Sequence, residues 1–161
     1  MEYLEIFKSL SLQKVKYLLC GGLAVNIYGI PRMTADIDLL IDFTTENLSR
    51  FETVVETLQY QAMLHIKINS FVSSAERRKA IEEKNLIAYS YFNNFSSTMN
   101  LNVLIDVPLK FEDMWDLTEI REAEGIEINL VSLEDLIKLK QYANRKQDND
   151  DIILLSKLLK K

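Results

Sequence analysis

Hydrophobic and polar positions follow two different periods along the chain, and the changes between them predict the order of its elements. Apolar stripes at helical spacing, such as Leu4, Ile6, Phe7 and Leu10, indicate amphipathic helices. Short runs rich in leucine, β-branched and aromatic residues indicate strands. Helices are expected over residues 2–12, 23–28, about 44–58, 75–84 and 112–115, from residue 132 onward and over about 148–159; strands are expected over residues 16–20, 36–41, 86–92, 101–107, 118–122 and 126–130.

Local signals define several element ends. Pro31 prevents the short second helix from continuing, and Glu124-Gly125 is the expected pivot of a hairpin. Ser132 with Asp135 resembles a capping box, with Asp in place of Glu. Residues 63–72 are open between a loop and a short strand, and residues 93–98 are expected to form a loop. These elements predict an α+β fold: one domain over residues 1–161, a small mixed sheet with helices packed on it, and C-terminal helices over about 132–160 packed on the core.

Composition agrees with an ordinary globular domain, because 48% of the residues are hydrophobic and 27% are charged. Cys20 is the single cysteine, which excludes an intramolecular disulfide and a zinc cluster built from cysteines. The apolar runs are much shorter than the ~20 residues that a membrane span needs. The N-terminus also lacks the basic start and apolar core of a signal peptide, so we expect a cytoplasmic protein.

The net charge of −5 argues against a surface coated with basic residues for binding nucleic acid. Local basic clusters are still possible. The first, residues 77–79, is best interpreted as a solvated helix face, and the second comprises Lys138, Lys140, Arg145 and Lys146.

Two carboxylates interrupt the apolar run at residues 36–41. Asp36 and Asp38 project from the same side of a strand, about 7 Å apart along the backbone, while Ile37 and Leu39 project from the other. Carboxylate oxygens are ligands that Mg²⁺ prefers. The alternative is an exposed strand face that simply carries acids, and Asp42 continues the same alternation.

Asp106 strengthens the metal hypothesis. It shares one strand face with Asn102 and Leu104, whereas Leu101, Val103 and Ile105 share the other face. If this strand pairs beside residues 36–41, Asp106 can complete a cluster of three carboxylates. Such a cluster can hold two divalent ions, the arrangement that supports in-line phosphoryl displacement.

Gly21-Gly22 stands between a predicted strand and a predicted helix. Glycines at this position let a phosphate approach the backbone N–H groups at the helix N-terminus, where the helix dipole favours negative charge. A tight structural turn is the alternative for an isolated pair of glycines. The order of strand, glycine pair, helix, loop and D-x-D favours the phosphate interpretation.

The segment GGLAVNIYGIPRMTADIDLLI resembles the signature of the nucleotidyltransferase superfamily, whose fold is shared with DNA polymerase β. Its smaller bacterial members have GG or GS, then G-x-x-R-x-T, then D-x-D. The run VSLEDLIKLKQYANRKQDNDDIILL is also similar to the end of this group. The resemblance is closest to the minimal nucleotidyltransferases that include toxins of abortive-infection type toxin–antitoxin pairs; it leaves about residues 60–98 unmatched, and Asn144 departs from a frequent glycine. The matching positions are Gly21, Gly22, Gly29, Arg32, Thr34, Asp36, Asp38, Lys140, Arg145, Asp148 and Asp151.

The resemblance implies a role for each matched residue. Asp36 and Asp38 would bind Mg²⁺, with two ions expected, and Asp106 would be the third ligand and the candidate base. Gly21 and Gly22 would hold the β- and γ-phosphates. Arg32, Lys140 and Arg145 would contact the nucleotide, although a surface role for Arg32 and a solvated position for Lys140 are open alternatives. Asp148 and Asp151 are expected to be structural.

The function implied is therefore a Mg²⁺-dependent nucleotidyltransferase that transfers an NMP from an NTP to a hydroxyl acceptor and releases pyrophosphate. The acceptor would be a tRNA end, a protein or a small molecule, and an antitoxin is the expected partner if the chain belongs to a toxin–antitoxin pair. The alternative is a nucleotide-binding or partner-binding protein that keeps the fold without chemistry. A kinase-like or ATP-hydrolysing protein is disfavoured, because G-x-x-x-x-G-K-[ST] and the kinase motifs are absent.

Overall fold

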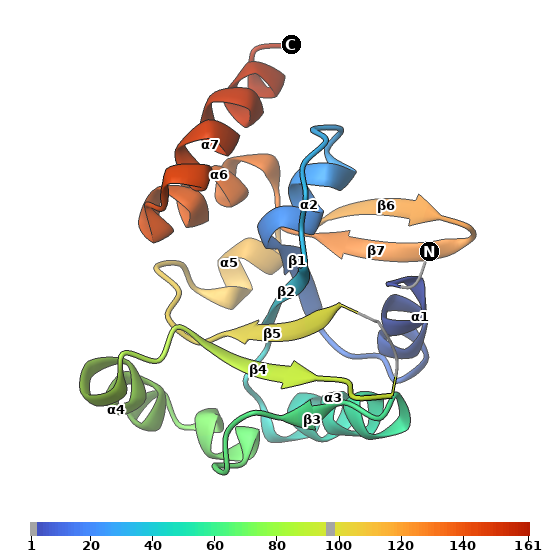
Figure 1. Cartoon of the computed structure of the whole chain (residues 1–161), viewed down its shortest axis with the longest axis vertical. Helices are drawn as coiled ribbons and strands as arrows, with labels where there is room; N and C mark the ends of the chain where they lie inside the picture. The colour runs from blue at the N-terminus through green and yellow to red at the C-terminus, as the bar shows by residue number, and fades with distance from the viewer. Residues whose placement is uncertain (1–2, 96–98) are drawn as a thin grey trace.

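The computed structural model describes residues 3–95 and 99–161, which form a mixed sheet with helices around it (Figure 1). The α+β fold class expected from the sequence is confirmed. The helices are α1 (Leu4–Leu12), α2 (Gly21–Ile27), α3 (Thr45–Thr57), η1 (Ile68–Val72, a 3₁₀ helix), α4 (Ser74–Lys84), α5 (Phe111–Trp115), α6 (Leu133–Ala143) and α7 (Lys146–Leu159). The strands are β1 (Tyr17–Cys20), β2 (Asp36–Ile41), β3 (Gln61–Ala62), β4 (Ala88–Phe92), β5 (Asn100–Leu104), β6 (Glu119–Ala123) and β7 (Ile126–Leu130).

The seven strands of the described chain lie in the order β3-β4-β5-β2-β1-β7-β6. β2 and β1 are central; β2 runs antiparallel to β1 and parallel to β5. β1 and β7 are also parallel, whereas β3–β4 and β4–β5 on one side of the sheet and β6–β7 on the other are antiparallel pairs. The first turn of α2 follows β1 without an intervening loop. Because Cys20 at the end of β1 pairs with Asp38, this turn begins beside the first residues of β2.

The core lies against the apolar face of the central strands. Ile37 and Leu39 of β2 are fully buried, as are Phe7 of α1 and Phe51 of α3. α3 begins where the sequence predicts, because the Thr44 side chain accepts a hydrogen bond from the Asn47 backbone N–H at 3.2 Å. The alternation of buried and half-buried residues in β2 leaves its aspartates on the face opposite this core.

Helices α6 and α7 pack against each other at the upper left of Figure 1. α6 begins after Ser132, whose hydroxyl accepts a hydrogen bond from the Asp135 backbone N–H at 3.2 Å. It ends at Asn144, which takes a left-handed conformation with φ 51°. An asparagine tolerates this conformation better than most residues, so the helix end forms although glycine is absent there.

Two segments differ from the sequence prediction. The third core strand ends at Leu104 rather than 107, because the backbone N–H groups of Ile105 and Asp106 both donate to the Ile87 carbonyl, at 2.8 and 3.1 Å. Two consecutive donors on one acceptor interrupt the ladder as a bulge does. Residues 63–72 contain the short 3₁₀ helix η1 instead of a strand, and part of the expected loop over 93–98 lies outside the described residues.

In the part of the chain that the structure describes, no helix has the length and apolar character needed to cross a membrane.

Candidate functional site

The turn from β1 into α2 packs directly against the D-x-D segment. Gly21 has φ +68°, and a Cβ atom there would lie 2.0 Å from Asp38 Oδ2. A Cβ atom on Gly22 would lie 2.7 Å from Thr34 Oγ1 and 3.1 Å from Arg32 Cζ. Gly21 is therefore needed for close packing against β2 and Gly22 for close packing against the segment before it, a role that differs from the phosphate contact expected from the sequence.

Asp36 and Asp38 occupy the first and third positions of β2 and share one face, as predicted. Both are half-buried, and the Asp36 carboxylate forms no hydrogen bond or ion pair with any residue that the structure describes. Burial raises the pKa of Asp38, and the charge of Asp36 raises it further. A hydrogen bond from Asn102 and the charges of Arg145 and Lys140 act in the opposite direction.

Asn102 is the residue directly opposite Asp38 on β5. Its side-chain Nδ2 donates to Asp38 Oδ1 at 2.9 Å, and its Oδ1 accepts from the Ser90 hydroxyl on β4 at 2.7 Å. The sequence places Asn102 on the same strand face as Asp106, but only the register shows that Asn102 meets the D-x-D pair. Ser90 carries no motif signal, and no feature of the sequence alone identifies it.

Asp106 does not join Asp36 and Asp38. It lies four residues beyond Asn102 and past the end of β5 at Leu104, outside the part of the strand that pairs with β2. Its Oδ1 accepts a hydrogen bond from the Tyr142 hydroxyl of α6 at 2.7 Å. Among the described residues there is no group of three or more His, Cys, Asp or Glu side chains placed to hold a metal ion. The expected cluster of three carboxylates is therefore not formed, because the register sets an amide where it required an acid.

A network of opposite charges joins the loop before β2 to helices α6 and α7. Lys140 is buried, with 4% of its side chain exposed, and its Nζ lies 3.2 Å from Asp148 Oδ1 and 2.7 Å from Asp151 Oδ2. Arg32 forms an ion pair with Asp151, and Arg145 Nε lies 2.8 Å from Asp148 Oδ2. The three cations exceed the two carboxylates by one positive charge. Because the side chain of Arg145 is 74% exposed, it is the cation of this network that a ligand can reach most readily.

Asp148 and Asp151 support this network from within α7, in agreement with the structural role expected for them. Asp148 also accepts a hydrogen bond from the Arg145 backbone N–H at 3.1 Å, which caps the helix. Burial tends to raise the pKa of Asp148, but the hydrogen bonds from Arg145 and the charge of Lys140 outweigh burial, so the pKa is lowered. The same hydrogen bonding to Asp148 raises the pKa of Arg145, which keeps its positive charge.

The three cations predicted to contact the nucleotide therefore lie near Asp38 together, and each of them forms an ion pair with Asp148 or Asp151. Lys140 and Arg145 lie near enough to lower the pKa of Asp38, and Arg32 lies against Gly22. The alternative of a solvated position for Lys140 is wrong, because its side chain is buried and doubly paired.

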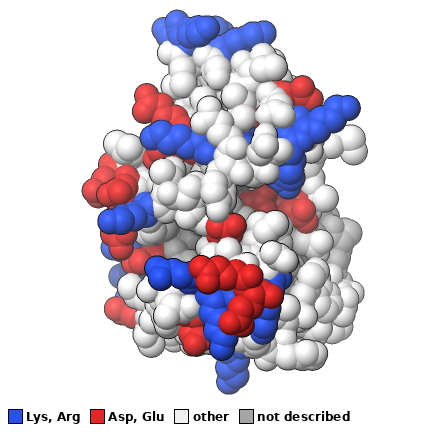
Figure 2. Space-filling model, turned by 90° about the vertical axis from the view of Figure 1, so that its left-hand side faces the viewer, with Lys and Arg blue, Asp and Glu red and all other residues white. Residues whose placement is uncertain are grey.

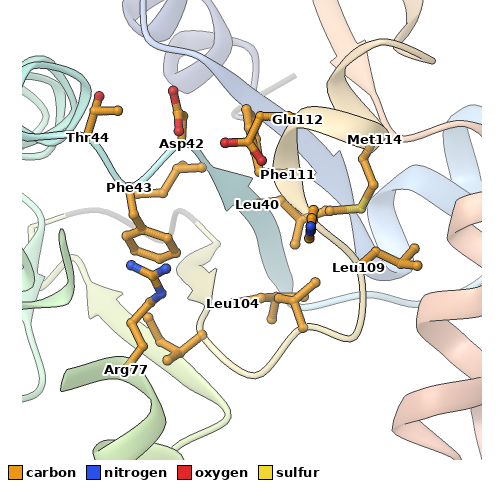
Figure 3. A pocket seen from close by; sticks show the side chains of 14 residues that line it. Leu40, Asp42, Phe43, Thr44, Arg77, Leu104, Leu109, Phe111, Glu112 and Met114 are labelled. Carbon is orange, nitrogen blue, oxygen red and sulfur yellow. The ribbon is translucent and has the colours of Figure 1, made fainter. Parts of the chain in front are cut away.

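A separate cavity of about 390 Å³ lies at the opposite end of β2 (Figure 3). Its wall includes Leu40, Asp42, Phe43 and Glu112, and the Arg77 guanidinium lies 4.7 Å from the centre of the Phe43 ring. Since Asp36 and Asp38 begin the strand and this cavity surrounds its end, the cavity is distinct from the D-x-D site.

Comparisons with known proteins agree with this geometry. The sequence model of the family described as "Nucleotidyl transferase AbiEii toxin, Type IV TA system" matches residues 3–151. A search of the curated proteins gave no match.

Three solved structures show the same fold. The lincomycin-bound lincosamide antibiotic adenylyltransferase LnuA has a TM-score of 0.63 at 16% identity, with 96% of this chain and 94% of that chain covered. ANT(2")-Ia in complex with adenylyl-2"-tobramycin has a TM-score of 0.57 at 15% identity, with 96% and 86% covered. An antigenic nucleotidyltransferase-like protein from Paracoccidioides brasiliensis has a TM-score of 0.56 at 18% identity, with 96% and 73% covered.

These findings confirm the resemblance that the D-x-D and C-terminal motifs indicated. Because the family match extends over residues 3–151, the chain belongs to the AbiEii nucleotidyl transferase toxin family and is a nucleotidyltransferase.

Proposed function

We propose that the protein transfers an NMP from an NTP to a hydroxyl acceptor, with release of pyrophosphate, in a reaction that depends on a divalent cation. The observation that carries this proposal is the position of Asp38. Its carboxylate shares a strand face with Asp36, lies against the Gly21 turn and is close to Lys140 of α6 and to Arg145, which precedes α7.

The residues of the site fit a divalent cation. Asp36 and Asp38 supply hard oxygen ligands, the type that Mg²⁺ prefers. Burial and the neighbouring Asp36 charge make an ionised Asp38 costly, and a bound cation would offset both effects. Asp36 and Asp38 would hold the cation; when bound, it would neutralise charge on the triphosphate and favour deprotonation of the acceptor hydroxyl. The expected number of two ions stays a prediction.

The positive residues near Asp38 suit a triphosphate. Arg145 is exposed and is the residue that we propose to contact the phosphates directly. Lys140 is enclosed between two aspartates, so we propose that it acts by holding α7 in place and adding positive potential. Arg32 would act in the same way from the loop before β2. The backbone N–H groups of the turn at Gly21 and Gly22 complete this proposed phosphate site.

In the proposed reaction, the acceptor oxygen loses its proton to water and bonds to the α-phosphorus of the NTP, while the bond from that phosphorus to the bridging oxygen breaks and pyrophosphate leaves. Asp106, the candidate base, lies beyond the end of β5 at Leu104 and accepts a hydrogen bond from Tyr142 rather than facing Asp36 and Asp38. Asp106 therefore has no part in the proposed reaction.

For the acceptor, a small molecule or a protein is favoured over a long RNA. The net charge is −5, and Figure 2 shows basic side chains next to acidic ones at the left and in the lower part of the face in view. Two of the similar structures are antibiotic adenylyltransferases, which also makes ATP the first nucleotide to test. The family description supports a toxin role with an antitoxin partner, in which production of the active protein slows growth.

The direct test is a transfer assay. The purified protein is incubated with Mg²⁺ and each of the four α-labelled NTPs, with total RNA, cell protein, and an aminoglycoside or a lincosamide as acceptors. We expect label in one acceptor class and release of pyrophosphate, both abolished by EDTA. Binding of NTP without any labelled product or pyrophosphate would instead support the alternative of a fold kept for binding.

A further inference from the structure

A row of polar side chains crosses three strands of the sheet and ends on Asp38. The register sets Ser90 of β4 opposite Asn102 of β5, and Asn102 opposite Asp38 of β2. Directly paired residues in a sheet project from the same face, so the three side chains lie in line. The Ser90 hydroxyl lies 2.7 Å from Asn102 Oδ1, and Asn102 Nδ2 lies 2.9 Å from Asp38 Oδ1.

The direction of these hydrogen bonds follows from the chemistry of the groups. An ionised carboxylate can only accept, so the amide of Asn102 must turn its NH₂ toward Asp38. The amide oxygen then faces Ser90, whose hydroxyl must donate. Each residue of the row therefore fixes the orientation of the next, and the chain of donors ends on one defined oxygen of Asp38.

The two oxygens of Asp38 consequently have different surroundings. Oδ1 is occupied by Asn102, whereas Oδ2 lies against the turn at Gly21, where a Cβ atom would come within 2.0 Å of it. With one oxygen held by Asn102, the plane of the carboxylate is set with respect to Asp36 and the α2 turn. Asn102 also holds a position where an acid would add a third carboxylate to the pair.

On the basis of the function proposed above, we propose that Ser90 and Asn102 are positioning residues, which orient Asp38 for the divalent cation and limit the site to two carboxylates. Cation affinity in this site would therefore depend on the amide of Asn102, which occupies the position that a third carboxylate could take. Cation affinity depends on the number and charge of the ligands, so a change at Asn102 should alter it directly.

Binding of Mn²⁺ tests this inference without any turnover, because the free ion is counted by its electron paramagnetic resonance signal. Asn102→Asp has almost the same shape, and Ser90 can still donate to it. Like Asn102→Leu, it removes the N–H donor to Asp38, but it also adds a third carboxylate beside the pair, and this added ligand charge is expected to dominate. We expect Asn102→Asp to lower the Kd for Mn²⁺ about tenfold. Asn102→Leu removes the hydrogen bond to Asp38, and we expect it to raise the Kd at least about tenfold.

Matched variants separate positioning from general effects on the fold. Asn129→Asp makes the same change in β7 of the same sheet, away from Asp38, and should leave the Kd for Mn²⁺ unchanged. Ser90→Ala should weaken binding, while Ser90→Thr, which keeps the hydroxyl, should restore it. A Kd for Asn102→Asp that equals the value for Asn129→Asp would overturn the inference.

The outcome for the proposed reaction is read separately. If the wild type binds Mn²⁺ and the variants follow this order but no nucleotide is transferred, the proposed function fails and the positioning role stands. If nucleotide is transferred but the variants at Ser90 and Asn102 bind Mn²⁺ like the wild type, the positioning role fails and the function stands.

Discussion

Asp38 is the residue on which the separate parts of the site converge. It contacts the turn at Gly21 and accepts a hydrogen bond from Asn102, and the negative charge of Asp36 acts on it. Burial is the largest cause of its raised pKa. A carboxylate kept half-buried beside a second carboxylate lowers the stability of the fold, and such groups gather where proteins bind ligands or do chemistry.

This arrangement predicts a gain in stability when Asp38 is neutralised. A group whose pKa is raised on folding contributes stability below its unfolded pKa, about 3.9 for Asp, and this contribution is lost as the pH rises through the folded pKa. At pH 7 the ionised carboxylate is therefore unfavourable in the folded state. We expect Asp38→Asn to have a higher free energy of unfolding than the wild type at pH 7 in EDTA.

Urea unfolding at several pH values measures this difference. The advantage of Asp38→Asn should shrink as the pH falls through the raised pKa of Asp38, because the carboxyl group of the wild type is then protonated and uncharged. Added Mn²⁺ should stabilise the wild type and have less effect on the variant. If Asp38→Asn is less stable than the wild type at pH 7 in EDTA, burial and the Asp36 charge do not destabilise the ionised Asp38 carboxylate, and the prediction is wrong.

Gly21 and Gly125 provide a matched pair of substitutions by alanine. Both have positive φ, 68° and 78°, so alanine should cost each about 1–2 kcal/mol of backbone strain. Only at Gly21 does the new Cβ meet Asp38, and nothing lies within 4 Å of it at Gly125. Because a shift of about 1 Å in a reacting group can reduce a rate ~10²-fold, we expect Gly21→Ala to lose transfer activity by that order.

Gly125→Ala should keep its activity despite the similar strain. Measurement of kcat/KM alongside urea unfolding separates the two effects. Equal losses of activity in both variants would show that strain, rather than displacement of Asp38, accounts for the effect at Gly21.

At the scale of elements, the strand and helix patterns were predictable and the pairing between them was not. The alternation of polar and apolar residues at 36–41 predicts β2, including which of its residues face the core and which carry the aspartates. The strand containing Asp106 was expected to run to residue 107 before Pro108, but the shared acceptor at Ile87 ends it at Leu104. The register of β5 against β2 sets Asn102 opposite Asp38. No local pattern within β5 indicates this register, so the sequence pattern points to Asp106 instead.

Helices α6 and α7 depend on the buried Lys140 for their mutual position. Its ammonium group lies between Asp148 and Asp151, and both carboxylates are buried. Lys140→Met removes this charge and leaves the aspartates with only Arg145 and Arg32. Breaking a buried ion pair typically costs 3–5 kcal/mol, and we expect about 3 kcal/mol here because each aspartate keeps one partner.

Lys138→Met is the matched control on the same helix. The side chain of Lys138 is 54% exposed and pairs with Asp135 at 3.1 Å, so its removal should cost less than about 1 kcal/mol. The free energies of unfolding from urea titration give both values. Equal costs for the two substitutions would contradict a buried network that holds α7 on the domain.

Across the whole molecule, the site draws on segments from both ends of the chain. The Gly21 turn and β2 come early, Asn102 comes from the middle and Lys140 from near the end (Figure 1). The motifs of the two ends were visible in the sequence because each is local. The Ser90–Asn102 row and the closed charge network were not, since both require strands and helices that are distant in sequence to meet.

The central claim is that Asp38, and not Asp106, belongs to the site of nucleotide transfer. The most direct test compares kcat/KM after the same substitution at these two aspartates. Asp38→Asn and Asp106→Asn each replace a carboxylate by an amide, but only Asp38 lies at the Gly21 turn. With Mg²⁺ and the NTP that the wild type uses, we expect Asp38→Asn to lower kcat/KM by at least about 10²-fold. Asp106→Asn should stay within about threefold of the wild type, since its partner Tyr142 lies on the surface. Equal losses at the two positions, or full activity of Asp38→Asn, would contradict the site described here.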